Sequence, residues 1–313
     1  MATEPHPQVQ AVLDVLRSNG VPPTHGLSVE SARDAFTLFF AGQSAESIAD
    51  TRDLSFPGAG SDVPIRVYEP EGERPHPICV YFHGGGWVLG NLDCYDNVCT
   101  MLANRAECLV VSVDYRLAPE HPFPAAPADC YAAAEWVAEN AGYLGGDPDR
   151  IAVAGDSAGG NLAAVVSLMA RDRDGPDISH QGLLYPAVNA GSVQGFDSYE
   201  ENAEGYFLEL ASMEWFSDRY ITDPIAERNP YAFPLQARDL ADLPPATIVS
   251  AGFDPLRDED FAYEDRLDEA DVPVSHHHFE EMIHGFCSMT DELDAAEEGL
   301  DAIADGLREG FEA

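Results

Sequence analysis

The residues best placed to do chemistry surround one serine. Gly155-Asp156-Ser157-Ala158-Gly159 follows the apolar run 151–154 and precedes a helix-forming stretch over 160–169. A strand that enters such a G-x-S-x-G sequence and continues into a helix makes a sharp turn, which exposes the serine hydroxyl above the carboxyl end of a sheet. The small flanking residues leave room for this strained turn. We therefore expect Ser157 to be a nucleophile.

A glycine run upstream supplies a second chemical element. His83-Gly84-Gly85-Gly86-Trp87 follows the strand-like residues 78–82. Consecutive glycines expose backbone N–H groups, which a ligand oxygen can approach closely. With the N–H of Ala158, such a loop can bind the oxyanion formed during acyl transfer. We expect Gly84, Gly85 and Ala158 to form this oxyanion hole, the alternative being a glycine-rich turn that only reverses the chain.

Five segments between about residues 60 and 290 form a distinctive set. They are His83-Gly84-Gly85-Gly86-Trp87, Tyr115-Arg116-Leu117-Ala118-Pro119-Glu120, Gly155-Asp156-Ser157-Ala158-Gly159-Gly160, Asp254-Pro255-Leu256-Arg257-Asp258 and His284-Gly285-Phe286. Together, and in this order, they resemble the hormone-sensitive-lipase-like branch of the α/β-hydrolases. The resemblance implies an α/β-hydrolase fold with a helical cap, and ester hydrolysis without a cofactor.

The acid and the base follow from chain order, which in this fold runs serine, acid, histidine. The hydrophobic run 246–253 delivers Asp254 to the loop after a strand, and the family's acid matches this aspartate. Asp258 competes, but it would lie in the first turn of the next helix, where the helix dipole already explains a carboxylate. His284 comes last, a short turn after the strand-like residues 274–279, so we expect it to be the general base.

The run His276-His277-His278 raises the question of a metal site. Side chains alternate along a strand, so His276 and His278 should share one side while His277 points away. Two histidines without a nearby set of further ligands make a poor closed site. We therefore predict strand residues and no metal.

The cysteines and the amino terminus bear on location. Six cysteines occur without a C-x-x-C pair, and Cys79 and Cys108 fall within buried-looking strands. A cytosolic enzyme of this length would keep its thiols reduced. The first ten residues lack a basic region followed by an apolar run, and no stretch approaches eighteen apolar residues. We expect a cytoplasmic protein without a membrane partner.

The charge is extreme. Asp and Glu number 56 against 16 basic residues, all of them arginine, for a formal charge of -40. This charge disfavours nucleic acid and anionic membranes as partners, and it destabilises the compact state unless salt screens the repulsion. The composition therefore predicts a halophilic protein of a salt-rich cytoplasm. The alternative is a cation binder, although the acids are scattered without calcium-loop spacing.

The elements that must position these groups alternate along the chain. With 313 residues and 45% hydrophobic content, the chain can bury one substantial core. Short apolar strands alternate with helical patterns, which predicts a mostly parallel, doubly wound α/β sheet. A final amphipathic helix is expected within 291–309. The expected strands are 64–69, 78–82, 108–114, 151–155, 181–185, 246–252 and 274–279.

Two segments interrupt this alternation. Residues 1 to about 50 carry helical patterns, and residues 190 to about 225 are rich in aromatic side chains. The resemblance implies that both belong to a cap, which leaves a catalytic core of about 51–189 and 226–313 within a single domain, 1–313. A cap would exclude water and supply an apolar acyl pocket. The alternative is that these aromatics pack only against the core.

These expectations combine into a serine carboxylesterase that hydrolyses short- to medium-chain esters through an acyl-enzyme intermediate. Its partner would be a small-molecule ester, and the sequence leaves a homodimer open. Three alternatives remain: an amidase or deacetylase with the same triad, a lipase acting on emulsified fat, and a non-catalytic small-molecule receptor on the same fold.

Overall fold

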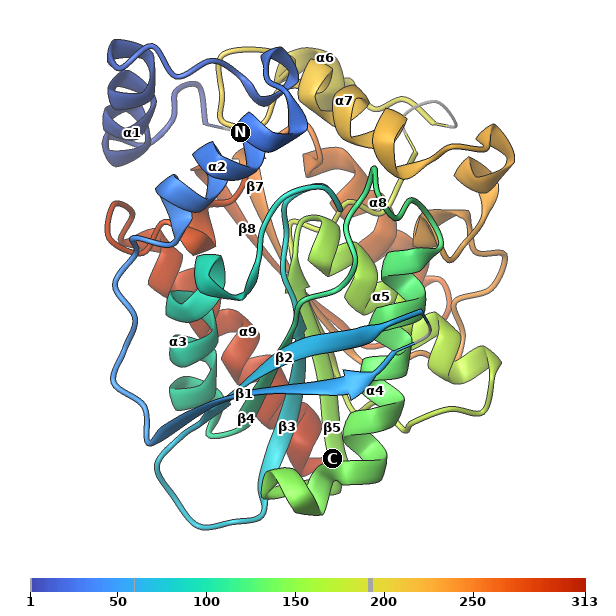
Figure 1. The fold of residues 1–313 in the computed structure, drawn as a ribbon. Coiled ribbons are helices and arrows are strands. Elements are labelled where there is room, and N and C mark those ends of the chain that lie inside the picture. Colours follow the sequence, from blue (N-terminus) through green and yellow to red (C-terminus); the bar gives the residue numbers. More distant parts are fainter. Residues whose placement is uncertain (1, 59, 191–193) are drawn as a thin grey trace.

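The computed structural model describes residues 2–58, 60–190 and 194–313, and an eight-stranded sheet runs through them (Figure 1). The strand order is β1-β2-β4-β3-β5-β6-β7-β8. β1 and β2 join the edge antiparallel, and the other strands run parallel to one another. The strands are β1 (Asp50–Pro57), β2 (Asp62–Glu69), β3 (His76–Phe82), β4 (Leu109–Val113), β5 (Gly146–Asp156), β6 (Gln181–Leu184), β7 (Ala246–Phe253) and β8 (Val274–Ile283).

The expected mostly parallel sheet is confirmed, with one strand that the sequence did not predict. β1 lies where we expected the amino-terminal cap segment to end. It pairs only with β2, at the edge of the sheet, and most of its residues are exposed or half-buried. Phe56 is its one fully buried side chain. Its inward face carries Arg52, Leu54 and Phe56, and only the last is fully buried, so the strand shows no apolar run in the sequence.

Helices cover both faces of the sheet, as a doubly wound fold requires. α4 (Ala125–Leu144), α5 (Ala158–Asp172) and α8 (Arg257–Asp268) contribute to the core on one face. α3 (Asp96–Ala106) and α9 (Ala295–Glu312) contribute to the core on the other. α9 is the final helix that the sequence predicts, and it begins after Leu293, which is buried in the preceding loop.

The remaining helices gather at the carboxyl ends of the parallel strands, at the top of Figure 1. The amino-terminal segment and the segment after β6 pack on each other there, although they are far apart in the sequence. Arg17 Nη2 donates to Gly205 O at 2.8 Å, and the Phe39 ring lies 5.8 Å from the Phe207 ring. These helices are α1 (Pro7–Ser18), α2 (Val29–Phe40), α6 (Asp197–Glu201) and α7 (Leu210–Tyr220).

Five short 3-10 turns connect the larger elements within the described residues. They are η1 (Thr24–Gly26), η2 (Leu92–Tyr95), η3 (Pro224–Arg228), η4 (Pro234–Gln236) and η5 (Phe286–Ser288). The second of them matters for the site, because Tyr95 ends it and turns its hydroxyl toward the carboxyl end of β5.

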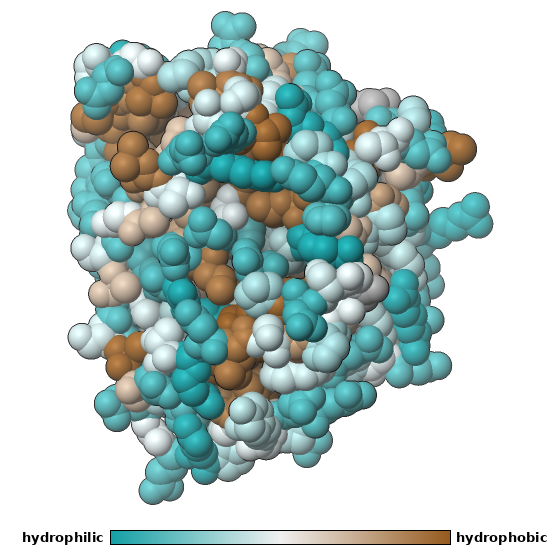
Figure 2. All heavy atoms as spheres, viewed as in Figure 1, coloured by the Kyte–Doolittle hydropathy of each residue, from teal (hydrophilic) through white to brown (hydrophobic). Residues whose placement is uncertain are grey.

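One face of the molecule is mostly polar. Figure 2 shows hydrophilic side chains over most of one face, with apolar side chains in separate groups between them. All six cysteines are buried and unpaired. In the part of the chain that the structure describes, no helix combines the length and the apolar character needed to cross a bilayer.

Candidate active site

Ser157 lies on a strained turn between β5 and α5. Its φ of 56° and ψ of -119° are unfavourable for a residue with a Cβ. Its N–H donates to Leu184 O at 2.8 Å, which ties the turn to the neighbouring strand. A Cβ built on Gly159 would lie 1.9 Å from Phe82 O, so the turn has no room for a larger residue there. Close packing thus holds the strained serine in place.

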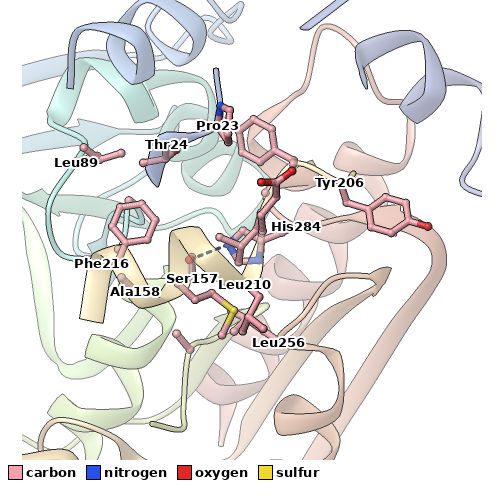
Figure 3. A pocket seen from close by; sticks show the side chains of 18 of the residues that line it. Pro23, Thr24, Leu89, Ser157, Ala158, Tyr206, Leu210, Phe216, Leu256 and His284 are labelled. Atoms are coloured by element: carbon pink, nitrogen blue, oxygen red, sulfur yellow. Dashed lines mark hydrogen bonds between the residues drawn. The ribbon is translucent and has the colours of Figure 1, made fainter. Parts of the chain in front are cut away.

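Three side chains form a continuous hydrogen-bonded chain. Ser157 Oγ lies 2.8 Å from His284 Nε2, a contact drawn in Figure 3, and His284 Nδ1 lies 2.7 Å from Asp254 Oδ2. Asp254 is fully buried, and its Oδ1 accepts from Leu256 N at 2.9 Å. A carboxylate only accepts, so the imidazole proton sits on Nδ1 and leaves the Nε2 lone pair facing the serine. This geometry can move a proton from Ser157 to His284.

Asp258, the competing acid, lies elsewhere. It is in the first turn of α8, as expected. Arg257 Nε donates to its Oδ1 at 2.7 Å, and Ser198 N donates to its Oδ2 at 2.9 Å. The structure therefore brings Asp254 to His284 and gives Asp258 other partners.

The oxyanion loop corrects one expectation. The N–H of Gly84 donates to Asp156 Oδ1 at 2.8 Å, so this group is not available to a substrate oxygen. Gly85 and Gly86 line the cavity beside Ser157 and Ala158, whereas Gly84 does not. Within the described residues, the N–H groups of Gly85 and Gly86 have no protein acceptor. The expected donor Gly84 therefore has a protein partner, whereas the N–H groups of Gly85 and Gly86 are left for a ligand.

His83 holds the start of this loop. Its Nδ1 lies 2.8 Å from Gly84 O, and its ring lies between the rings of Tyr95 and Tyr115. Burial lowers the pKa of His83 to about 4, so the ring is neutral near pH 7 and Nδ1–H donates to the carbonyl. The Tyr115 hydroxyl donates to His83 O at 2.6 Å. The Tyr115–Glu120 segment of the sequence motif therefore supports the oxyanion loop.

Asp156 is the site residue that sequence reasoning missed. Its Oδ1 accepts from the Tyr81 hydroxyl at 2.8 Å and its Oδ2 from the Tyr95 hydroxyl at 3.1 Å. Burial raises the pKa of Asp156 to about 6, while these hydroxyls and the Gly84 N–H stabilise the ionised form. The available signal was an ionisable residue between an apolar strand and Ser157.

A cavity of about 1100 Å³ opens over Ser157 and His284. Its walls come largely from the two segments above the sheet, and Figure 3 shows Leu210 and Phe216 near the serine, with Tyr206 farther away. The Phe216 ring packs on the oxyanion loop, since a Cβ built on Gly86 would lie 2.3 Å from it. Apolar walls around a few convergent polar groups are typical of a small-molecule site.

The histidine run lies outside this cavity. His276 Nε2 and His278 Nδ1 both bond Ser250 Oγ, at 2.7 and 2.8 Å, while His277 is exposed. The expected sharing of one side by His276 and His278 is therefore confirmed. His276 also bonds Glu264. Over residues 2–58, 60–190 and 194–313, no group of three or more His, Cys, Asp or Glu side chains is arranged to hold a metal.

Comparison with known proteins places the chain among hydrolases. A family model described as alpha/beta hydrolase fold matches residues 79–288. The chain is 45% identical to Esterase LipI of Mycobacterium tuberculosis, over 82% of this chain and 81% of that protein. It is 40% identical to an Arylesterase of Saccharolobus solfataricus, over 77% and 78% of the two chains.

Solved structures agree. An esterase from the archaeon Pyrobaculum calidifontis superposes with a TM-score of 0.90 at 40% identity, over 98% of this chain and 99% of that one. An alpha/beta hydrolase enzyme from the metagenome of Lake Arreo, Spain, superposes with a TM-score of 0.95 at 37% identity, over the whole of both chains. The chain therefore belongs to the α/β-hydrolase family, in the hormone-sensitive-lipase-like branch that its motifs resemble.

Proposed function

We propose that this protein is a serine carboxylesterase that hydrolyses short- to medium-chain esters of small molecules. The observation that carries the proposal is the hydrogen-bonded chain from Ser157 Oγ through His284 to buried Asp254, at the floor of a largely apolar cavity. Relatives named as esterases or carboxylesterases, at 40–45% identity over most of the chain, support ester hydrolysis.

In the first half of the reaction, Ser157 Oγ attacks the ester carbonyl carbon while His284 Nε2 takes the hydroxyl proton. Asp254 Oδ2 accepts a hydrogen bond from His284 Nδ1–H and stabilises the imidazolium. The carbonyl oxygen becomes an anion and accepts hydrogen bonds from the N–H groups of Gly85, Gly86 and Ala158, because these residues line the cavity beside the serine.

Collapse of this intermediate breaks the bond to the alcohol oxygen, which leaves with the proton from His284. A water molecule then attacks the acyl carbon of the acyl-enzyme, and His284 accepts its proton. The second intermediate releases the carboxylic acid, and the same proton returns to Ser157 Oγ. The cycle consumes one water and needs no cofactor.

We propose that residues 1–50 and 190–225 act as a cap that excludes water from this chemistry. The described helices of both segments lie over the carboxyl ends of the strands and supply side chains to the cavity. The cavity volume of about 1100 Å³ slightly exceeds the roughly 300–1,000 Å³ that is typical of small-molecule sites.

The test is a panel of p-nitrophenyl esters of graded acyl length, with matched p-nitroanilides. The wild type should hydrolyse the shorter esters fastest, and Ser157→Ala should lower kcat by on the order of 10⁴ or more while the melting temperature is retained. Ser250→Ala is the matched control, because Ser250 Oγ also bonds a histidine but lies outside the cavity. Its turnover should stay near normal.

Each outcome separates a candidate. Near-normal turnover in folded Ser157→Ala would refute the assignment of the nucleophile. Faster cleavage of anilides than of esters would favour an amidase, and ligand binding without turnover of either would favour a receptor.

A further inference from the structure

Asp156 is a buried carboxylate that the proposed chemistry does not use. It ends β5, immediately before Ser157, and is 4% exposed. No arginine or histidine forms an ion pair with it in the described parts of the chain. Its partners are instead the Tyr81 and Tyr95 hydroxyls and the Gly84 N–H. Burial of a charge without a cation is costly, so the position calls for a specific reason.

The hydrogen bond from the Gly84 N–H to Asp156 is one of two that hold the first peptide of the oxyanion loop. In the peptide between His83 and Gly84, the Tyr115 hydroxyl holds the carbonyl and Asp156 holds the N–H. The C=O and N–H of a trans peptide point in opposite directions, so the two contacts grip this peptide from both sides. Its rotation is thereby fixed.

The next peptide, between Gly84 and Gly85, has a hydrogen bond of its own. Its carbonyl, Gly84 O, lies 2.8 Å from His83 Nδ1. The N–H of Gly85 therefore points the opposite way, away from the His83 ring. Gly85 is also the first residue of the loop that lines the cavity. Rotation of the Gly84 peptide would turn this N–H away from a substrate oxygen.

The carboxylate and the loop are in direct contact. A Cβ built on Gly84 would lie 2.2 Å from Asp156 Oδ2 and 2.9 Å from the Tyr95 hydroxyl. Tyr81 and Tyr95 hold one oxygen each, from β3 and η2. The two tyrosine hydroxyls thus fix the position of the carboxylate, and its Oδ1 also accepts the hydrogen bond from the Gly84 N–H.

We propose that Asp156 is a positioning residue for ester hydrolysis, which holds the Gly84 N–H and thereby sets the oxyanion donors of Gly85 and Gly86 relative to Ser157. Asp156 and Ser157 are consecutive, so one short piece of backbone carries the nucleophile and anchors the loop that must meet it. Oxyanion donors stabilise the transition state only when they are already aimed at the developing charge. This inference rests on the proposed esterase function.

The experiment compares Asp156→Ala and Asp156→Asn with the wild type. The readouts are kcat and KM on p-nitrophenyl butyrate, and the affinity for a trifluoromethyl ketone, which adds to Ser157 and places an oxyanion in the hole. Loss of one oxyanion donor typically costs about 10²–10³ in kcat. Asp156→Ala should lose about that factor in kcat and in ketone affinity, with KM within about threefold.

Asp156→Asn should recover to within about tenfold of the wild type, because an amide oxygen can still accept from the Gly84 N–H. Glu69→Gln is the control for loss of a buried carboxylate. Glu69 is 8% exposed, bonds Arg74 and lies outside the cavity. It should change the melting temperature and leave kcat unchanged.

A double-mutant cycle tests whether Asp156 acts through Gly84. Gly84→Ala alone should lower kcat at least tenfold, since its Cβ meets Asp156 Oδ2 and displaces the loop. In the Asp156→Ala background the 2.2 Å contact is gone and the remaining close contact, 2.9 Å, is with the terminal hydroxyl of Tyr95, so the further loss should be less than about threefold. Additive losses would overturn the proposed connection.

The outcomes distinguish this inference from the proposed function. If the wild type hydrolyses no ester, the esterase proposal fails first. If it does, folded Asp156→Ala with kcat and ketone affinity within threefold of the wild type overturns the positioning role. If Asp156→Ala does not fold, Gly84→Ala decides: a normal kcat overturns the inference, and a loss in kcat at constant KM supports it.

Discussion

The change Asp254→Asn tests the acid with almost no change of shape. In the structure, Asp254 Oδ1 accepts from Leu256 N, and Oδ2 faces His284 Nδ1. The backbone N–H of Leu256 requires an acceptor, so it selects the orientation of the new amide: oxygen toward Leu256 and NH₂ toward His284. The amide NH₂ donates, which forces Nδ1 to become the acceptor and moves the imidazole proton to Nε2. Nε2 then cannot take the Ser157 proton.

The expected loss follows from this wrong tautomer. In another Ser-His-Asp hydrolase, the same exchange lowers kcat by about 10⁴ with the geometry intact. That factor equals about 5.5 kcal/mol of transition-state stabilisation. KM should change little, because the cavity walls are untouched. The assay is steady-state hydrolysis of p-nitrophenyl butyrate at pH 8, with a thermal melt to establish folding.

Asp258→Asn is the matched control, four residues away on the same loop and helix. Its amide oxygen can still accept from Ser198 N, so only the ion pair with Arg257 is lost. Turnover should stay within about twofold, and the free energy of unfolding should fall by roughly 1 kcal/mol or less. Inactive Asp258→Asn beside active Asp254→Asn would refute the acid assignment. Full activity in both would refute a Ser-His-Asp mechanism.

Three further predictions follow from the cavity, the charge and a second buried acid. Phe216→Ala should raise kcat/KM for octanoate relative to acetate esters about tenfold, because the ring fills the cavity beside Gly86; unchanged chain-length preference would exclude it as the acyl limit. The melting temperature should rise steeply between 0.1 and 2 M potassium chloride, since the screening length falls from about 10 Å at 0.1 M to about 3 Å at 1 M; a flat or falling curve would refute the halophilic prediction. Burial raises the pKa of Glu259 to about 8, so the folded state binds its proton more tightly than the unfolded state, and this contribution to stability is lost as pH rises from about 4.5 to 8. The melting temperature of the wild type relative to Glu259→Gln should therefore fall across that range, and a constant difference would show that Glu259 is not protonated in the fold.

Much of the fold and site can be predicted from the sequence because the signals are local. The turn at Ser157 is a strand, a turn and a helix in consecutive residues, and the parallel strands β3, β4, β6 and β7 each contain a short apolar run. Asp254 and His284 follow the carboxyl ends of β7 and β8, and adjacent parallel strands end at the same edge of the sheet. Local patterns and strand order together bring the three side chains into one place.

Features without a local signal could not be predicted. β1 is an edge strand whose side chains are mostly polar, and the alternation of Leu54 and Phe56 is too short to predict its pairing with β2. Phe39 contacts Phe207, which lies in a distant segment of the chain, and the helical pattern of neither segment predicts this contact. Such contacts depend on how the elements pack in space, and a single sequence does not record this.

In the oxyanion loop, too, a single hydrogen bond could not be predicted from the sequence. A glycine run predicts that N–H groups are accessible, but each peptide's rotation decides where its N–H points. In this protein, that rotation is set by Asp156 and by Tyr115, which come from other parts of the chain. Gly84 therefore satisfies every sequence criterion for an oxyanion donor, and yet its N–H donates to the Asp156 carboxylate. Gly84 and Asp156 are therefore joined by a hydrogen bond that neither local sequence reveals, and the double-mutant cycle measures how far the effect of one variant depends on the other.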